Sequence, residues 1–288
     1  MPADPIVVGY DGSDGADAAL RWALDDGART GTPVVLVYAF EWRTVAGPIG
    51  LAPAVWPDDS AREDARKVIA AALAWVRESR PGVEVSGTVV DGTAAGVLVE
   101  RSRRASLVVL GGRGRSAFAD LLVGSASVAV SAHAHCPVVV VRGREPAAGG
   151  PVVVGFDGSD CARLAVEFGL AQAAVRGTDL HLVHAWAPPV PRWQPPGFDL
   201  REQLRVEQAE LEEVLVGWRG RYPLVPTSVH IVTAPPTLAL VDASAGAQLV
   251  VVGSRGRGGF RGLLLGSVSQ QLLHYASCPV AVVRELPA

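Results

Sequence analysis

Lysine is almost missing from this chain. Lys67 is the only lysine among 26 basic residues, so nearly all of the positive charge is carried by arginine. A nucleotide loop of the Walker type needs a lysine directly after its last glycine, and Lys67 does not follow a glycine-rich loop. The sequence therefore excludes a Walker-type site. The formal net charge is only −3, so no global field draws the chain to nucleic acid or to a membrane surface.

Cysteine and long apolar runs are also scarce. The three cysteines, Cys136, Cys161 and Cys278, are far apart and form no Cys-x-x-Cys pair, so we expect neither a disulfide framework nor a zinc site. No apolar run reaches the ~18 residues of a membrane-spanning helix. The N-terminus lacks the basic and then apolar pattern of a secretory leader. These features favour a cytoplasmic protein with no membrane partner and no metal site of its own.

The sequence contains two copies of one unit. Ile6–Leu24 returns 146 residues later as Val152–Leu170, and Ser106–Ser127 returns 142 residues later as Gln248–Ser269. The repeated unit has a typical domain length, too long for one repeat of a solenoid. We expect a first domain over residues 1–143, a Gly/Pro/Ala linker over residues 144–150 and a second domain over residues 151–288.

Apolar β-branched runs alternate with helical patterns in each copy. In the first copy the expected strands are Ile6–Tyr10, Pro33–Phe40, Val83–Val90, Leu107–Gly111 and Pro137–Arg142. The expected helices are Gly15–Arg29, Ser60–Glu78, Ala94–Arg104 and Ser125–Ala134. Continuous apolar runs fit strands buried on both faces, so we expect a five-stranded parallel sheet with helices on both faces, twice over. Ligands of such folds bind beyond the carboxyl ends of the strands.

A connection rich in glycine and arginine follows the fourth expected strand of each copy. In the second copy, Val250–Ser267 holds six glycines and three arginines. Glycine permits positive φ and a close approach of the backbone to a ligand. Successive N–H groups of such a loop form an anion-binding concavity, to which the next helix adds its positive dipole end. Ser267 is also a good N-cap, so a serine-capped turn is the plain structural alternative. Because the loop occurs twice at the same place, we favour phosphate binding.

The spacing of the loop glycines narrows the class of site. The pattern Gly-x-x-Gly, nine residues, Gly-Ser occurs in both copies, at Gly111, Gly114, Gly124 and Ser125 and at Gly253, Gly256, Gly266 and Ser267. Together with the openings "VVGYDGS" and "VVGFDGS", it resembles the universal stress protein family in its ATP-binding, tandem-domain form. The resemblance implies two tandem Rossmann-like α/β domains and ATP as the nucleotide. A divalent ion such as Mg²⁺ would then bridge the phosphates.

The resemblance further implies two nucleotide sites. The loop after the first strand lies beside the nucleotide, the end of the second strand meets adenine, and the glycine loop wraps ribose and phosphates. In the first domain the implied residues are Gly9, Asp11, Ala39, Gly111, Gly112, Arg113, Gly114, Arg115, Ser116, Gly124, Ser125 and Ala126. In the second domain they are Gly155, Asp157, Ala185, Gly253, Ser254, Arg255, Gly256, Arg257, Gly258, Gly259, Gly266, Ser267, Val268 and Ser269. The first loop carries Asp120 and fewer glycines, so we expect the first site to be weaker.

Two functions compete, and a third reading is a plain scaffold that has kept a nucleotide loop and no longer binds nucleotide. One is an ATP-binding stress regulator, not an enzyme, whose nucleotide occupancy governs its conformation or an unknown protein partner. The alternative is a slow ATPase or a nucleotide-transferring enzyme of related fold. Gly253–Ser269 contains no carboxylate, histidine or glutamine to orient a water molecule, which favours the first.

Two further stretches bear on partners. The last expected strands, Pro137–Arg142 and Pro279–Arg284, predict a homodimer or a pairing of the two domains, because edge strands pair readily. The arginine run Arg101–Arg104 lies at an expected helix C-terminus, where the helix dipole favours cations, and we expect no nucleic-acid partner.

Overall fold

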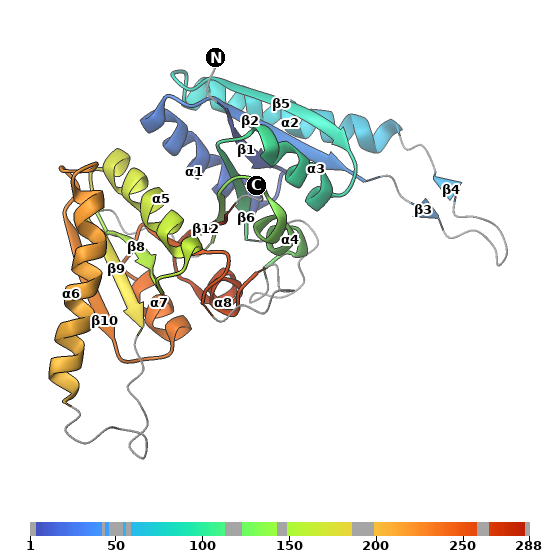
Figure 1. Ribbon diagram of the computed structural model, residues 1–288. Helices are drawn as coiled ribbons and strands as arrows, with labels where there is room; N and C mark the ends of the chain where they lie inside the picture. The colour runs from blue at the N-terminus through green and yellow to red at the C-terminus, as the bar shows by residue number, and fades with distance from the viewer. Residues whose placement is uncertain are drawn as a thin grey trace. The chain divides into compact units, whose positions relative to one another are not determined.

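The computed structural model describes residues 4–41, 44–45, 54–55, 59–112, 123–142, 149–185, 199–257 and 265–285. The chain divides into two compact units, Met1–Val141 and Arg142–Ala288, and each is described by itself (Figure 1). Both are α/β units built around five parallel strands, as the sequence predicts.

The first unit has the strand order β7-β6-β1-β2-β5. Its strands are β1 (Ile6–Gly9), β2 (Val34–Phe40), β5 (Val85–Asp91), β6 (Leu107–Gly111) and β7 (Val138–Val141), and its helices are α1 (Asp14–Thr30), α2 (Asp59–Ser79), α3 (Ala94–Arg101) and α4 (Ser125–His133). Right-handed crossovers put α1 and α2 on one face of this sheet and α3 and α4, which contact each other, on the opposite face. A short antiparallel pair, β3 (Thr44–Val45) and β4 (Ala54–Val55), is an addition that the sequence pattern did not predict.

The second unit repeats this arrangement with the strand order β12-β11-β8-β9-β10. Its strands are β8 (Val152–Gly155), β9 (Leu180–Ala185), β10 (Thr227–Val232), β11 (Leu249–Gly253) and β12 (Val280–Val283), and its helices are α5 (Asp160–Arg176), α6 (Leu200–Arg219), α7 (Pro236–Ser244) and α8 (Ser267–Tyr275). In both units the strand order reverses beside the first strand, which is where doubly wound folds bind ligands.

The two cores follow from the continuous apolar strands. In β1 and in β8 the first three residues are fully covered, and the same is true of the first four residues of β6 and β11. The outer strands β5 and β10 are different, because no residue of either strand is buried. Each sheet is therefore least buried at the edge formed by β5 or β10, whereas the outer strands β7 and β12 are buried over most of their length.

The predicted helix Ala94–Arg104 is wrong at its end. The α-helix stops at Arg101, and Ser102–Arg104 form a separate turn of 3₁₀-helix. Ser102 causes the change, because its hydroxyl donates to the Val99 carbonyl at 2.6 Å and accepts the His135 amide at 2.8 Å. Across the described ranges, no helix is both long enough and apolar enough to cross a membrane.

Candidate functional site

An identical turn follows the first strand of each unit. In the first, the Asp11 carboxylate accepts hydrogen bonds from the amide and the hydroxyl of Ser13, at 3.0 and 2.6 Å. Ser13 in turn caps α1 by accepting the Ala16 amide at 3.2 Å. Gly12 has φ of 78°, a conformation that favours glycine. This is why the sequence reads Asp-Gly-Ser at the start of both copies.

In the second unit the same turn also binds the glycine loop. Asp157 repeats both bonds to Ser159, at 3.0 and 2.6 Å, around Gly158 with φ of 80°. Its other carboxylate oxygen accepts the backbone amide of Arg257 at 2.9 Å. One carboxylate therefore joins the Asp-Gly-Ser turn to the glycine loop that follows β11.

The described glycines of the two loops are required for space rather than for unusual backbone angles. We expected positive φ in this connection, but Gly253, Gly256 and Gly266 all avoid that region, as do Gly111 and Gly112 in the first unit. A Cβ on Gly256 would collide with the Asp157 carboxylate, and one on Gly253 would lie 2.8 Å from the Cβ of Cys161. At these described glycines the expectation is wrong, because the space is limited by contacts with segments that are distant in sequence. Gly114, Gly258, Gly259 and Gly262 lie outside the described residues.

The helix after the glycine loop begins without a side-chain cap. The expectation that Ser267 is the N-cap is wrong, because Gly266 holds that position and Ser267 is already helical. α4 begins in the same way at Gly124. Ser269 binds back to the carbonyls of Ser254 and Gly266, at 3.3 and 2.9 Å. Because no side chain caps the first turn of α8, its N–H groups remain available to an anion.

These segments enclose a cavity of about 450 Å³ at the carboxyl ends of β8, β9 and β11. Eleven residues implied by the family resemblance line it: Gly155, Asp157, Ala185, Gly253, Arg255, Gly256, Arg257, Gly266, Ser267, Val268 and Ser269. A cavity of this size lies within the range of ~300–1,000 Å³ for small-molecule sites. Ser254 is buried beneath the loop and does not line the cavity, and Gly258 and Gly259 lie outside the described residues.

Sequence reasoning missed five further lining residues, Phe156, Ala162, Val183, Pro236 and Val252. All are apolar, so together with Ala185 they make one side of the cavity fit a flat apolar ring. Pro236 opens α7 directly after β10, at the same edge of the sheet. The signal that could have found it is its position just after a strand whose carboxyl end faces the cavity.

The polar side of the cavity is cationic. Arg255 and Arg257 line it. Nearby, burial and then the charge of Arg255 lower the pKa of Arg284, while Cys161 acts in the opposite direction. The Cys161 sulfur lies 3.9 Å from the Ser254 hydroxyl, in a buried position behind the loop. The cavity thus joins an apolar wall to a rim of backbone amides and guanidinium groups.

The first unit repeats the frame of this site. The Gly124 amide donates to the Gly112 carbonyl at 2.9 Å, as the Gly266 amide does to Ser254 at 2.7 Å. The Ser127 hydroxyl donates to the Gly111 carbonyl at 2.9 Å. The rest of the predicted loop, Arg113, Gly114, Arg115 and Ser116, lies outside the described residues.

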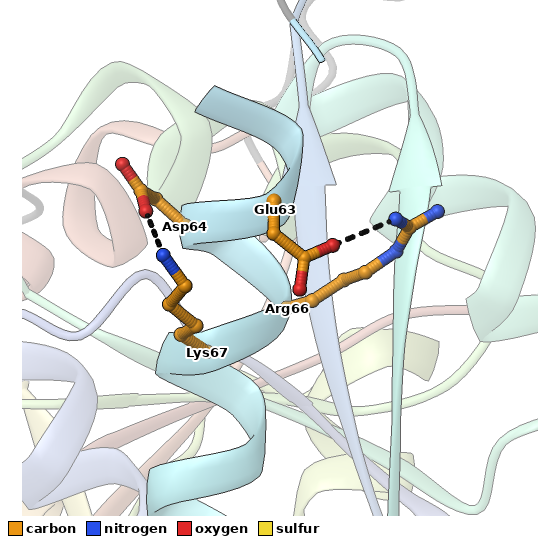
Figure 2. A network of polar contacts seen from close by, with 4 residues as sticks. All are labelled: Glu63, Asp64, Arg66 and Lys67. Carbon is orange, nitrogen blue, oxygen red and sulfur yellow. Dashed lines mark hydrogen bonds and ion pairs between the residues drawn. The ribbon is translucent and has the colours of Figure 1, made fainter. Parts of the chain in front are cut away.

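The only lysine belongs to a different part of the chain. Lys67 forms an ion pair with Asp64 at 2.9 Å on the exposed face of α2, beside the pair of Arg66 with Glu63 at 3.0 Å (Figure 2). The hydrogen bond to Asp64 and its charge raise the pKa of Lys67. No group of three or more histidine, cysteine, aspartate or glutamate side chains could hold a metal ion within the described ranges.

Fold and cavity together define a class of tandem α/β proteins with a cavity at the carboxyl ends of the strands. The model of the universal stress protein family matches residues 2–142 and again residues 150–284. Universal stress protein Rv2005c of Mycobacterium tuberculosis is 39% identical over 287 residues, which cover 97% of each chain. A universal stress protein of Mycolicibacterium smegmatis is 37% identical over 294 residues, or 97% of this chain and 96% of its own. The chain belongs to the universal stress protein family.

A solved structure supports the same fold. The crystal structure of a universal stress protein from Archaeoglobus fulgidus covers 99% of both chains with a TM-score of 0.70, at 21% sequence identity.

Proposed function

We propose that this protein binds ATP in the cavity of the second unit and in the matching place of the first. The observation that carries the proposal is the joining of an apolar pocket to a cationic backbone rim. Phe156, Val183 and Ala185 suit the adenine ring, and the amides of Gly256 and Ser267 suit the phosphates. A phosphate group at an uncapped helix start next to arginines is favoured by both hydrogen bonding and charge.

We further propose that the protein holds ATP rather than consuming it, and that nucleotide occupancy regulates its conformation or a protein partner in a stress response. Asp157 is the only carboxylate among the described residues that line the cavity. Its oxygens are engaged by Ser159 and by Arg257, so it is not poised to orient an attacking water. A site that stabilises the bound nucleotide without a positioned nucleophile leaves the barrier to hydrolysis high.

Mg²⁺ fits the proposal only as a companion of the nucleotide. The cavity supplies arginine side chains and one engaged carboxylate, whereas Mg²⁺ is commonly held through a few carboxylates, substrate phosphates and water. The ion would therefore arrive on the phosphates. The proposal also includes a cytoplasmic location, consistent with three free, buried cysteines.

Identification of the small molecule that co-purifies with the protein, followed by calorimetric titration, tests the function. We expect ATP to survive purification and to bind with a stoichiometry near two. Steady phosphate release of the order of 1 s⁻¹, the lower range for working enzymes, that is lost in Asp157→Asn or Asp120→Asn would instead assign the slow ATPase. Failure of both ATP and ADP to bind would overturn both functions.

Assembly through the last strand of each unit, β7 or β12, stays part of the proposal, since an outer strand offers backbone groups for pairing. Light scattering that finds a dimer supports it. A strict monomer, with amides of both strands exchanging freely with solvent, would contradict it.

A further inference from the structure

A second groove, of about 880 Å³, lies in the first unit and shares no residue with the nucleotide site. Its floor is formed by Val7 of β1, Val35 of β2 and Val90 of β5. Val7 and Val35 are register partners, and Val35 pairs with Ser86, which is four residues before Val90. Because alternate residues of a strand point to the same side, all three valines belong to one face of the sheet.

The groove exists because α3 covers that face incompletely. α3 has only eight residues and packs on β1 and β2. It presents Gly96 and Val97 to the groove, and a Cβ on Gly96 would lie 3.0 Å from the Thr93 hydroxyl oxygen. β5 contributes a strand without a single buried residue. Val35 and Val90 are therefore partly exposed to the groove, whereas Val7 stays buried.

One end of the groove is cationic. α3 runs back toward the amino ends of the strands, where the Ser106 amide donates to the Pro5 carbonyl at 3.0 Å. Arg101, Arg103 and Arg104 line the groove there, and Arg103 is paired with Glu100 at 3.0 Å. Arg101 and Arg104 are exposed, and neither has a hydrogen-bond or ion-pair partner within the described residues.

The opposite end carries no spare charge. Asp91 is held by Arg62 through two contacts, at 2.6 and 2.8 Å. Both acidic residues of the groove, Asp91 and Glu100, are thus paired. The guanidinium groups of Arg101 and Arg104 remain without a partner among the described residues, at one end of the groove. Arginine binds carboxylate through two parallel hydrogen bonds, and an apolar body gains by leaving water.

We propose that this groove binds an amphipathic small-molecule carboxylate, of the class of medium-chain fatty acids. The hydrocarbon chain lies along Val35 and Val90, and the carboxylate meets Arg101 and Arg104. This assignment is independent of the nucleotide site.

The second unit supplies a natural control. It has a groove of about 520 Å³ at the same place, lined by Val153, His181, His230 and Asp242 among others. In the repeat, which is offset by 142 residues here, Ala243 corresponds to Arg101 and Gly246 corresponds to Arg104. The backbone frame is shared, since the Ser244 hydroxyl makes the same two bonds as Ser102, at 2.6 and 2.8 Å. Of these two grooves, only the one in the first unit is lined by arginines that have no partner among the described residues.

Calorimetric titration of the full chain with dodecanoate, below its micelle concentration, tests the proposal. We expect saturable binding near one molecule per chain, and at least about tenfold weaker binding of dodecanol, which keeps the chain and lacks the charge. The double variant Arg101→Ala/Arg104→Ala copies the absence of charge in the second unit and should weaken dodecanoate binding by about tenfold or more. Arg77→Ala, a surface arginine on α2, is the matched control and should change nothing.

Two further measurements make the result decisive. Val35→His copies the polar residue found at this place in the second unit, leaves the arginines intact, and should weaken dodecanoate and dodecanol alike. A photoreactive diazirine analogue of dodecanoate should label the peptide that carries Val35 or peptides within residues 85–104. Unchanged affinity in the double arginine variant, unchanged affinity in Val35→His, labelling elsewhere, or absence of saturable binding to the wild-type chain would each overturn the proposal.

Discussion

The two units share a backbone frame and differ in the side chains placed against it. A Cβ on Gly111 would collide with the backbone of Gly15, and a Cβ on Gly253 would press on Cys161, so both loops run close against the first helix of their unit. Gly15 and Cys161 occupy the same place in the repeat, yet one has no side chain and the other has a thiol. Duplication has kept the close approach and changed the chemistry behind it.

The largest difference between the sites should appear on changing Gly256. Gly256→Glu puts a Cβ against the Asp157 carboxylate and adds a negative charge at the cationic rim. We expect the second site to be lost, so that the stoichiometry of ATP in a calorimetric titration falls from near two to near one. The remaining binding should be the weaker component.

Gly217→Glu is the matched control, because Gly217 on α6 has open space around it. It should bind like the wild-type chain. Gly114→Glu, made at the corresponding glycine of the first unit, should instead remove the weaker component. A folded Gly256→Glu protein that still binds two nucleotides would show that the site is placed wrongly.

The next effect concerns the carboxylate between the two loops. Asp157→Glu lengthens a side chain that holds the amides of Ser159 and Arg257 at once, and the longer chain cannot keep both bonds. We expect about tenfold weaker ATP binding at the second site, the equivalent of losing roughly one hydrogen bond to a charged group.

Asp199→Glu is the matched control. The Asp199 carboxylate also accepts the amide two residues ahead, that of Arg201, at 2.9 Å, but Asp199 is the N-cap of α6 and does not line the cavity. It should leave nucleotide binding unchanged. Equal affinities of the Asp157→Glu and wild-type proteins in the same titration would contradict the role of this carboxylate.

A smaller effect should follow from exchanging the residues behind the loops. Cys161→Gly gives the second unit the residue of the first, and it removes a buried side chain that packs on Gly253. We expect a loss of about 1–2 kcal/mol in the free energy of unfolding of the second unit, from the cavity and from glycine within a helix. Urea denaturation measures it. Cys161→Ala keeps the Cβ and should cost less; equal losses in both variants would refute the packing argument.

The smallest effect is a dependence on pH. Burial and then the charge of His230 lower the pKa of His181 below 6.5, with Asp179 acting in the opposite direction. The two imidazole rings lie 4.6 Å apart. Below pH 6.5 the unfolded chain therefore binds more protons at His181 than the folded chain, so stability falls as the pH falls.

His181→Val introduces the residue found at the corresponding position of the first unit, Val35. It should reduce the loss of stability that occurs as the pH falls. Thermal unfolding midpoints at about pH 7.5 and about pH 5.5 give the comparison. If both proteins lose the same amount on acidification, His181 has no part in it.

The sequence predicted the sheet and the glycine loop because both depend on local signals. Apolar β-branched runs mark the strands, and their alternation with helices forces the parallel order. The contributions of Phe156, Ala162 and Pro236 to the cavity depended on contacts between segments far apart in sequence. The sequence also did not predict that Gly266, rather than Ser267, is the N-cap of α8. Serine is a common N-cap residue, and only the backbone angles show which residue holds the position.

The position of β1 has a consequence for how the chain is made. β1 is synthesised before both of its neighbours, yet it lies inside its sheet, where Ile6 lies opposite both Val34 and Leu107. At about 5–20 residues per second, the ribosome delivers the second of these neighbours roughly 5–20 seconds after β1 itself. During that interval the edge of β1 that will pair with β6 has no partner. β8 of the second unit has nearly the same residues as β1 and competes for the position between β2 and β6. Because β8 is synthesised after β6, the order of synthesis favours pairing of β6 with β1.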